Sequence, residues 1–198
     1  MLHLFAGPNG AGKSTLFAFM QKIYLLDTVS QINGDVIYKE NPRLTQDELA
    51  AIVGQLVKES FQNRHSFSFE SNLATSASYT VVQSARQKGY RIILRYVNLD
   101  SATHCRDRVI ERVSKGGHDV PYAIIEQRYK NALSLIKQHY LLFDDIDFID
   151  NSAGSFTSVL RVETGKLTYQ AEKLPAWAVG IVNHIRMMEK AIRKTNAD

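Results

Sequence analysis

The stretch "GPNGAGKST" near the start of the chain constrains the fold more than any other feature of the sequence. Gly7, Gly12, Lys13 and Ser14 fit the pattern G-x-x-x-x-G-K-[ST]. An apolar run at residues 2–6 precedes it and predicts a buried strand, and residues 14–24 follow it with the apolar spacing of a helix. A strand, a glycine loop and a helix are the context in which this pattern forms a phosphate-binding loop, or P-loop.

The residue types in this loop indicate its ligand. Glycines allow several backbone N–H groups to converge on an anion at a helix N-terminus, where the helix dipole also favours negative charge. Lys13 is suited to neutralise the β- and γ-phosphates, and the hydroxyl of Ser14 is suited to ligate Mg²⁺. We therefore expect a bound nucleoside triphosphate, with ATP and Mg²⁺ as cofactors. The residues predicted to contact it are Gly7, Pro8, Asn9, Gly10, Ala11, Gly12, Lys13, Ser14 and Thr15.

The composition favours one globular domain in a reducing compartment. The chain has 198 residues, of which 44% are hydrophobic and 22% charged. The net charge of +4 contains no dense run of Lys and Arg, so we expect no nucleic-acid partner. Cys105 is the only cysteine, and we predict that it is a buried apolar residue. No apolar run is long enough to span a membrane, and the P-loop leaves no room for a signal peptide, so a cytoplasmic location is expected.

Strand-like and helix-like segments alternate along most of the chain. This rhythm, with a P-loop after the first strand, predicts an α/β fold: a three-layer α/β/α sandwich of the P-loop NTPase type around a mostly parallel five-stranded sheet. We expect residues 1–155 to form a kinase-like core with a lid near 106–128, and residues 156–198 to form a hairpin and helix packed on that core. The predicted strands are 2–6, 28–35, 65–71, 90–99 and 145–152; the predicted helices are 14–24, 43–64, 75–89, 101–116, 122–140 and 174–194; the hairpin is 158–170.

Short polar signals refine some of these boundaries. Thr45 and Glu48 have the spacing of a capping box, and Asp100 is placed to cap the helix that follows it. Thr164 and Gly165 are predicted to form the turn of the hairpin.

Two carboxylates are predicted at the carboxyl ends of strands, where ligands bind in parallel sheets. Asp35 is suited to accept the proton of an acceptor hydroxyl during phosphoryl transfer, and its alternative role is a turn or cap aspartate. Glu70 is suited either to hold a hydroxylated acceptor or to order Mg²⁺ through water. Asn72 is a candidate acceptor ligand, with helix capping as its alternative role.

Arginines on two successive helices flank a loop with two glycines in "RDRVIERVSKGGHDVPYAIIEQRY". Glycine hinges allow such a loop to close over a nucleotide, and guanidinium groups suit the charge of a transferring phosphoryl group. The competing interpretation is a solvated charged face with Arg108 and Arg112 one helical turn apart. Several arginines around a glycine loop favour a lid. His118 is suited either to contact phosphate or to fix the loop conformation.

The ordered set "GPNGAGKST", "NGD", "FESNLAT", "RVIERVSKGGHDVP", "QRY" and "IDNS" resembles the zeta-toxin family of P-loop small-molecule kinases, in particular its chromosomal relatives. The resemblance implies that Asp35 is the catalytic base and that Glu70 binds the acceptor. It also implies that Lys13, Arg112 and Arg128 act on the triphosphate, the two arginines from the lid. The implied activity is transfer of the γ-phosphate of ATP to a hydroxyl, in known members that of a UDP-linked N-acetyl amino sugar. A small helical antitoxin is the implied partner.

Two observations limit this resemblance. Plasmid-borne members carry E-G-T-x-R after the third strand, whereas this chain has Ala74 at the arginine position, which weakens the case for that sugar nucleotide but not for phosphoryl transfer. "GPNGAGKSTL" is also typical of transporter-type ATPases, but the glycine-rich signature of that class is missing before "YLLFDDID". A nucleotide-binding or ATP-hydrolysing interaction protein without an acceptor is the remaining alternative. The presence of Asp35, Glu70 and the lid favours an enzyme.

Overall fold

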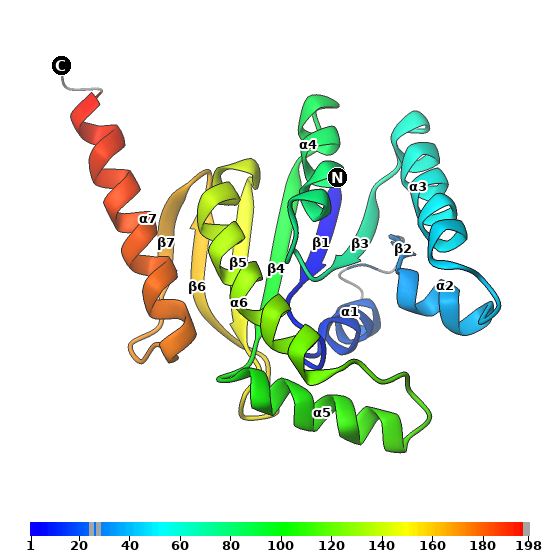
Figure 1. Ribbon diagram of the computed structural model, residues 1–198. Coiled ribbons are helices and arrows are strands. Elements are labelled where there is room, and N and C mark those ends of the chain that lie inside the picture. The colour runs from blue at the N-terminus through cyan, green and yellow to red at the C-terminus, as the bar shows by residue number, and fades with distance from the viewer. Residues whose placement is uncertain (24–25, 27–28, 196–198) are drawn as a thin grey trace.

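The computed structural model describes residues 1–23, 26 and 29–195, and a mixed sheet runs through this part of the chain (Figure 1). Its strand order is β2-β3-β1-β4-β5-β6-β7, with β1 to β5 parallel and the last two strands antiparallel. The α/β class is confirmed. The strands are β1 (Leu2–Ala6), β2 (Ser30–Ile32), β3 (Phe67–Ser71), β4 (Ile92–Asn98), β5 (Asp145–Asp150), β6 (Thr157–Glu163) and β7 (Lys166–Gln170).

The C-terminal hairpin is part of the sheet, which therefore has seven strands in the described residues rather than the expected five. Strand β6 pairs with β5, so the hairpin extends the edge that five parallel strands would leave open. Thr164 and Gly165 form its turn with φ angles of 48° and 78°. Two consecutive positive φ angles suit the right-handed twist of the two strands, as predicted for this hairpin.

Helices follow most of the strands, with three departures from the prediction. The short helix after β2, Gly34–Glu40, was not predicted. The segment after Thr75 begins as a 3₁₀ turn, Ser76–Tyr79, before the α-helix. Ser101, not Asp100, caps the helix after β4, because its side chain accepts from the His104 N–H at 3.1 Å. The helices are α1 (Lys13–Lys22), α2 (Gly34–Glu40), α3 (Gln46–Gln62), α4 (Thr80–Gln87), α5 (Ala102–Ser114), α6 (Tyr122–His139) and α7 (Ala176–Thr195).

Other boundary signals are confirmed or lie outside the described residues. The capping box of α3 is present, with Thr45 and Glu48 bonded reciprocally. The predicted end of the first helix at Tyr24, the predicted start of the second strand at Thr28 and the final residues 196–198 lie outside the part that the structure describes. Among the described residues, no helix is long and apolar enough to cross a membrane.

Helices cover the sheet on two sides and form two apolar cores. Residues of α3, α4, α6 and α7 pack on one face of the sheet, together with Leu2 and Leu4 of β1. In Figure 1, α6 crosses in front of the strands, whereas α3 lies beside β2 and α7 beside β7. Residues of α1 and α5 pack in a second core around Phe5. Cys105 is fully buried in this second core, and burial raises the pKa of its thiol to about 12. The thiol therefore stays protonated, as predicted for a buried apolar cysteine.

His3 on β1 is a buried base whose titration affects stability. Its ring Nδ1 lies 3.2 Å from Nη1 of Arg95, which can only donate, so the ring accepts and is neutral. Burial, Arg95 and the nearby N-terminus lower the pKa of His3 from 6.5 to about 4. The unfolded chain therefore takes up a proton between these two pH values while the folded chain does not, and the free energy of unfolding falls as the pH falls through this window.

We expect His3→Gln to remove this contribution to the pH dependence. Glutamine can still accept from Arg95 but does not titrate. Between pH 7 and pH 5 the wild type should lose about 1 kcal/mol more stability than the variant, after a discount for partial solvent screening. Urea unfolding of both proteins at both pH values measures this difference. An equal loss in the two proteins would show that His3 does not titrate as described.

Candidate functional site

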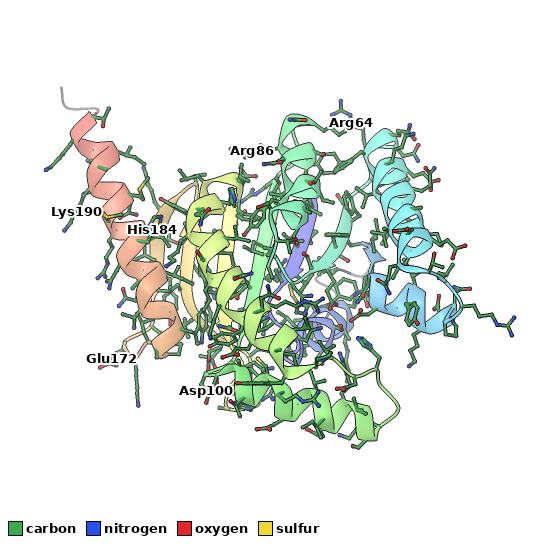
Figure 2. The ribbon with its side chains drawn as sticks, viewed as in Figure 1. Arg64, Arg86, Asp100, Glu172, His184 and Lys190 are labelled. Carbon is green, nitrogen blue, oxygen red and sulfur yellow. The ribbon has the colours of Figure 1, made fainter. Side chains whose placement is uncertain are left out.

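A cavity of about 950 Å³ opens at the carboxyl ends of the parallel strands. Figure 2 labels Asp100 at this end of the strands, near the start of α5, and Arg86 at the opposite end. The P-loop, α2, β3, α5 and the loop after β5 all contribute to its wall. The lining residues used below are Asn9, Gly10, Gly12, Lys13, Ser14, Asn33, Asp35, Glu70, Arg108, Arg112, His118, Asn151 and Phe156.

The P-loop has the backbone that its glycines predict. Gly7 has a φ of 138°, and a Cβ there would lie 1.9 Å from the carbonyl oxygen of Val97, so the loop passes directly against β4. Gly12 has a φ of 103° and precedes α1, whose first turn has no side-chain cap. The free N–H groups of this helix start therefore face the cavity edge as an anion site.

Lys13 is the buried cation of the site. Its Nζ donates to the carbonyl oxygens of Gly7 at 3.0 Å and Pro8 at 3.2 Å, and to Oδ1 of Asn72 at 3.2 Å. Burial lowers the pKa of Lys13, while the carboxylates of Glu70 and Asp35 act in the opposite direction. The ammonium is thus held by carbonyl oxygens that an incoming phosphate can replace.

Asn72 contacts Lys13 and does not cap a helix. The 3₁₀ turn that follows is capped by Thr75, whose side chain accepts from the Ser78 N–H at 3.3 Å. The capping alternative for Asn72 is therefore wrong. Its side-chain oxygen instead accepts a hydrogen bond from the Lys13 ammonium, which lines the cavity.

Ser14 and Glu70 place two oxygens side by side. The hydroxyl of Ser14 donates to Oε2 of Glu70 at 2.8 Å, and Nδ2 of Asn33 donates to the same oxygen at 2.7 Å. Among the described residues, no group of three or more His, Cys, Asp or Glu side chains could hold a metal alone. A hydroxyl and a carboxylate completed by phosphate and water oxygens are the donor set that Mg²⁺ accepts, so these residues fit this cation.

Asp35 lies in the first turn of α2, not at the end of a strand as predicted. Strand β2 ends at Ile32, and Asn33 caps the short helix by accepting from the Asp35 N–H at 2.9 Å. The carboxylate of Asp35 is nevertheless exposed and lines the cavity. The structure therefore brings Asp35 to the same cavity as Lys13 and Glu70, by a different local route.

The two arginines that were predicted to belong to a lid lie in different places. Arg112 lines the cavity, and its Nη2 donates to the carbonyl oxygen of His118 at 2.9 Å. A Cβ on Gly117 would lie 2.6 Å from Cγ of Arg112, so this glycine leaves room for the arginine stem. Arg128 instead donates to Oδ1 of Asn9 at 2.8 Å and contacts the P-loop from α6.

Several polar residues of the site were missed in the sequence. Asn33 and Asn151 are 4% and 5% exposed, and both directly follow strands. An asparagine at that position, in "NGD" and "IDNS", was the signal that could have identified them. Phe156 reaches the cavity because β6 folds back onto β5, and no local pattern predicts that contact.

Comparison with known proteins identifies sequence relatives. The family model described as Zeta toxin matches residues 1–159. An uncharacterized protein of Haemophilus influenzae (strain ATCC 51907 / DSM 11121 / KW20 / Rd) is 27% identical over 125 residues, which are 63% of this chain and 89% of the relative.

Solved structures share the fold at low sequence identity. A chain of the PezAT chromosomal toxin–antitoxin system of Streptococcus pneumoniae aligns with a TM-score of 0.66 and 16% identity, over 100% of this chain and 87% of that one. A chain of the AvrRxo1-ORF1:-ORF2 complex with ATP aligns with a TM-score of 0.64 and 14% identity, over 85% of this chain. This chain spans 60% of the length of that AvrRxo1 chain.

Proposed function

We propose, because this chain belongs to the zeta-toxin family, that it transfers the γ-phosphate of ATP to a hydroxyl group of a small molecule. The family supports ATP-dependent phosphotransfer in general. One observation on this chain supports the proposal. The P-loop cation Lys13, the carboxylates of Asp35 and Glu70 and the guanidinium of Arg112 line a single cavity from four different elements.

Asp35 is the proposed general base of the transfer. Its exposed carboxylate takes the proton of the acceptor hydroxyl as the acceptor oxygen bonds to the γ-phosphorus. The bond between that phosphorus and the β,γ-bridging oxygen breaks, and ADP leaves. Glu70, which accepts hydrogen bonds from Ser14 and Asn33, is the proposed acceptor ligand in the same cavity.

The positively charged side chains of the site compensate the negative charge of the phosphates. Lys13 binds the β- and γ-phosphates in place of its present carbonyl contacts. Arg112 and Arg128 are the proposed lid groups that meet the charge spread over the transferring phosphoryl group. Mg²⁺ held by Ser14 supplies further neutralisation of the phosphate oxygens when bound.

The nature of the acceptor and of the protein partner is a finer proposal. A UDP-linked N-acetyl amino sugar is the acceptor that the family resemblance suggests, although Ala74 replaces an arginine of the plasmid-borne pattern. A small helical antitoxin is the proposed partner, supported by the PezAT system among the structural relatives. The cytoplasm is the proposed location, because ATP is available there.

Turnover of ATP with and without a panel of hydroxylated small molecules, UDP-N-acetylglucosamine among them, tests the proposed function. We expect ADP formation that depends on an acceptor, with phosphate recovered on that acceptor. ADP and free phosphate without any acceptor dependence would instead indicate an ATPase. ATP binding without turnover would indicate a nucleotide-binding interaction protein.

We expect Arg112→Ala and Arg128→Ala each to lower turnover more than they weaken ATP binding. A group that meets charge in the transition state affects the rate more than the ground-state affinity when it is lost. We predict a decrease in turnover of about 10²-fold, the scale for one lost preorganised donor, measured together with the Kd for ATP.

Arg86→Ala is the matched control for these two variants. Arg86 pairs with Asp144 at 2.6 Å at the far edge of the sheet, so its loss removes an arginine without touching the cavity (Figure 2). Unchanged turnover in Arg112→Ala and Arg128→Ala would show that neither arginine acts in the transfer and that both are solvated or structural residues.

A further inference from the structure

Asn151, the residue after β5, connects three parts of the nucleotide site. Its side-chain Nδ2 donates to the carbonyl oxygen of Ala11 in the P-loop at 2.8 Å. Its backbone N–H donates to the carbonyl oxygen of Asn98 at the end of β4, at 3.0 Å. Its own carbonyl oxygen accepts from Nη2 of Arg108 on α5 at 2.7 Å. One buried residue therefore holds both the phosphate loop and an arginine from the lid region.

The contact with the P-loop is tight. A Cβ on Gly12 would lie 2.6 Å from Nδ2 of Asn151, so the amide packs against the loop backbone itself. Ala11, which receives the hydrogen bond, is fully buried. The free-energy cost of desolvating a buried amide is offset only when the amide is hydrogen-bonded, and this requirement favours one fixed arrangement of the amide and the loop.

Arg108 is placed to contact the same ligand as the loop. Its side chain lines the cavity together with Gly10, Gly12 and Lys13. A guanidinium carries five N–H donors in a planar fork, and the bond to Asn151 fixes the plane while using only one of them. The remaining donors suit a phosphate group, which accepts paired hydrogen bonds from arginine.

From this geometry we propose that Asn151 is a positioning residue of the nucleotide site and that Arg108 is a third arginine that binds the triphosphate. The side-chain amide of Asn151 holds the backbone of the P-loop in place, and the main-chain oxygen of the same residue orients the guanidinium of Arg108 toward the phosphates. This inference rests on the proposed function only for the identity of the ligand, ATP. A purely structural asparagine would stabilise the fold without affecting the affinity for ATP.

A double-mutant cycle tests the proposal. The Kd for ATP with Mg²⁺ is measured by calorimetry for the wild type, Asn151→Ala, Arg108→Ala and the double variant, together with the melting temperature of each protein. We expect Arg108→Ala to raise the Kd about 10-fold, the usual scale for one lost hydrogen bond to a charged group. Asn151→Ala should raise it about 5-fold, the scale for one lost hydrogen bond between neutral groups. Asn151→Ala keeps the main-chain oxygen that holds Arg108, so the two substitutions remove separate contacts with the ligand site. The Kd of the double variant should therefore be raised by about the product of the two single effects.

Ser152→Ala is the matched control. Its hydroxyl accepts from the Asp100 N–H at 2.8 Å and donates to Asp150 at 2.9 Å, so the substitution removes hydrogen bonds next to Asn151 without touching the P-loop. It should lower the melting temperature and leave the Kd for ATP unchanged.

Each other outcome overturns a defined part of the proposal. A wild-type Kd in folded Asn151→Ala makes that residue structural, and a Kd of the double variant no higher than that of one single variant overturns the separate roles of the amide and the guanidinium. If Asn151→Ala does not fold, the Kd for ATP of Arg108→Ala tests the proposal. A wild-type Kd in that variant overturns the contact between Arg108 and the triphosphate. A wild type that binds ATP but transfers no phosphate would overturn the proposed function and leave the binding cycle valid. A wild type that does not bind ATP would overturn both.

Discussion

Replacement of Lys13 by alanine is expected to lower acceptor-dependent ATP turnover by about 10³-fold, the upper scale for the loss of one preorganised group that stabilises developing charge. Nζ of Lys13 is the buried cation at the start of α1, and no other lysine lies at that helix start. Without it, the β- and γ-phosphates would face the carboxylates of Glu70 and Asp35 with less compensation. Turnover under saturating acceptor, measured by ADP formation, gives the result.

The fold should survive this substitution. Alanine loses three hydrogen bonds to Gly7, Pro8 and Asn72, but it also removes the cost of burying a charge, and these two effects oppose each other. Lys22→Ala, an exposed lysine in the last turn of the same helix, is the control and should keep wild-type turnover. Wild-type turnover in Lys13→Ala would mean that the phosphate site has been misassigned.

For Asp35→Asn we expect the transfer rate to fall by about 10²-fold or more, the usual scale for a general base. Asparagine keeps the shape and hydrogen-bonding capacity of the side chain but cannot take the proton of the acceptor. The backbone of Asp35 should hold its place, because the Asn33 cap bonds to the main-chain N–H and not to the carboxylate. A product assay that follows phosphate onto the acceptor measures the rate.

Binding of ATP with Mg²⁺ separates the possible roles of Asp35. It should stay within a few-fold of wild type in Asp35→Asn, because the P-loop N–H groups, Lys13 and Ser14 hold the triphosphate. Glu40→Gln, in the last turn of the same helix α2, is the matched control. A surviving product rate would make Asp35 structural, and a loss of ATP binding would place it in the metal site.

The local sequence was sufficient to predict the P-loop and much of the secondary structure. Gly7 and Gly12 take backbone angles that disfavour other residues, so their spacing before Lys13 already defines the loop. The capping box of α3 and the turn at Thr164 and Gly165 follow in the same way, since each depends on residues a few positions apart.

Asp35 shows where local reasoning fails. The sequence placed it correctly in the crevice but on the wrong element, because α2 has only seven residues and a short helix gives little periodicity. The cap at Asn33 defines the start of this helix, and that same side chain also reaches across to Glu70 on β3.

Only the tertiary structure decided which distant residues share the site. Arg128 meets Asn9 across 119 positions of sequence, and Asn151 meets Ala11 across 140. Strand order brings the ends of β1, β4 and β5 together, and pairing of the hairpin with β5 brings Phe156 to the cavity. The sequence by itself determined the loop that grips a phosphate, because that depends on local backbone freedom. The surroundings of that loop depend on packing between strands, which no local pattern contains.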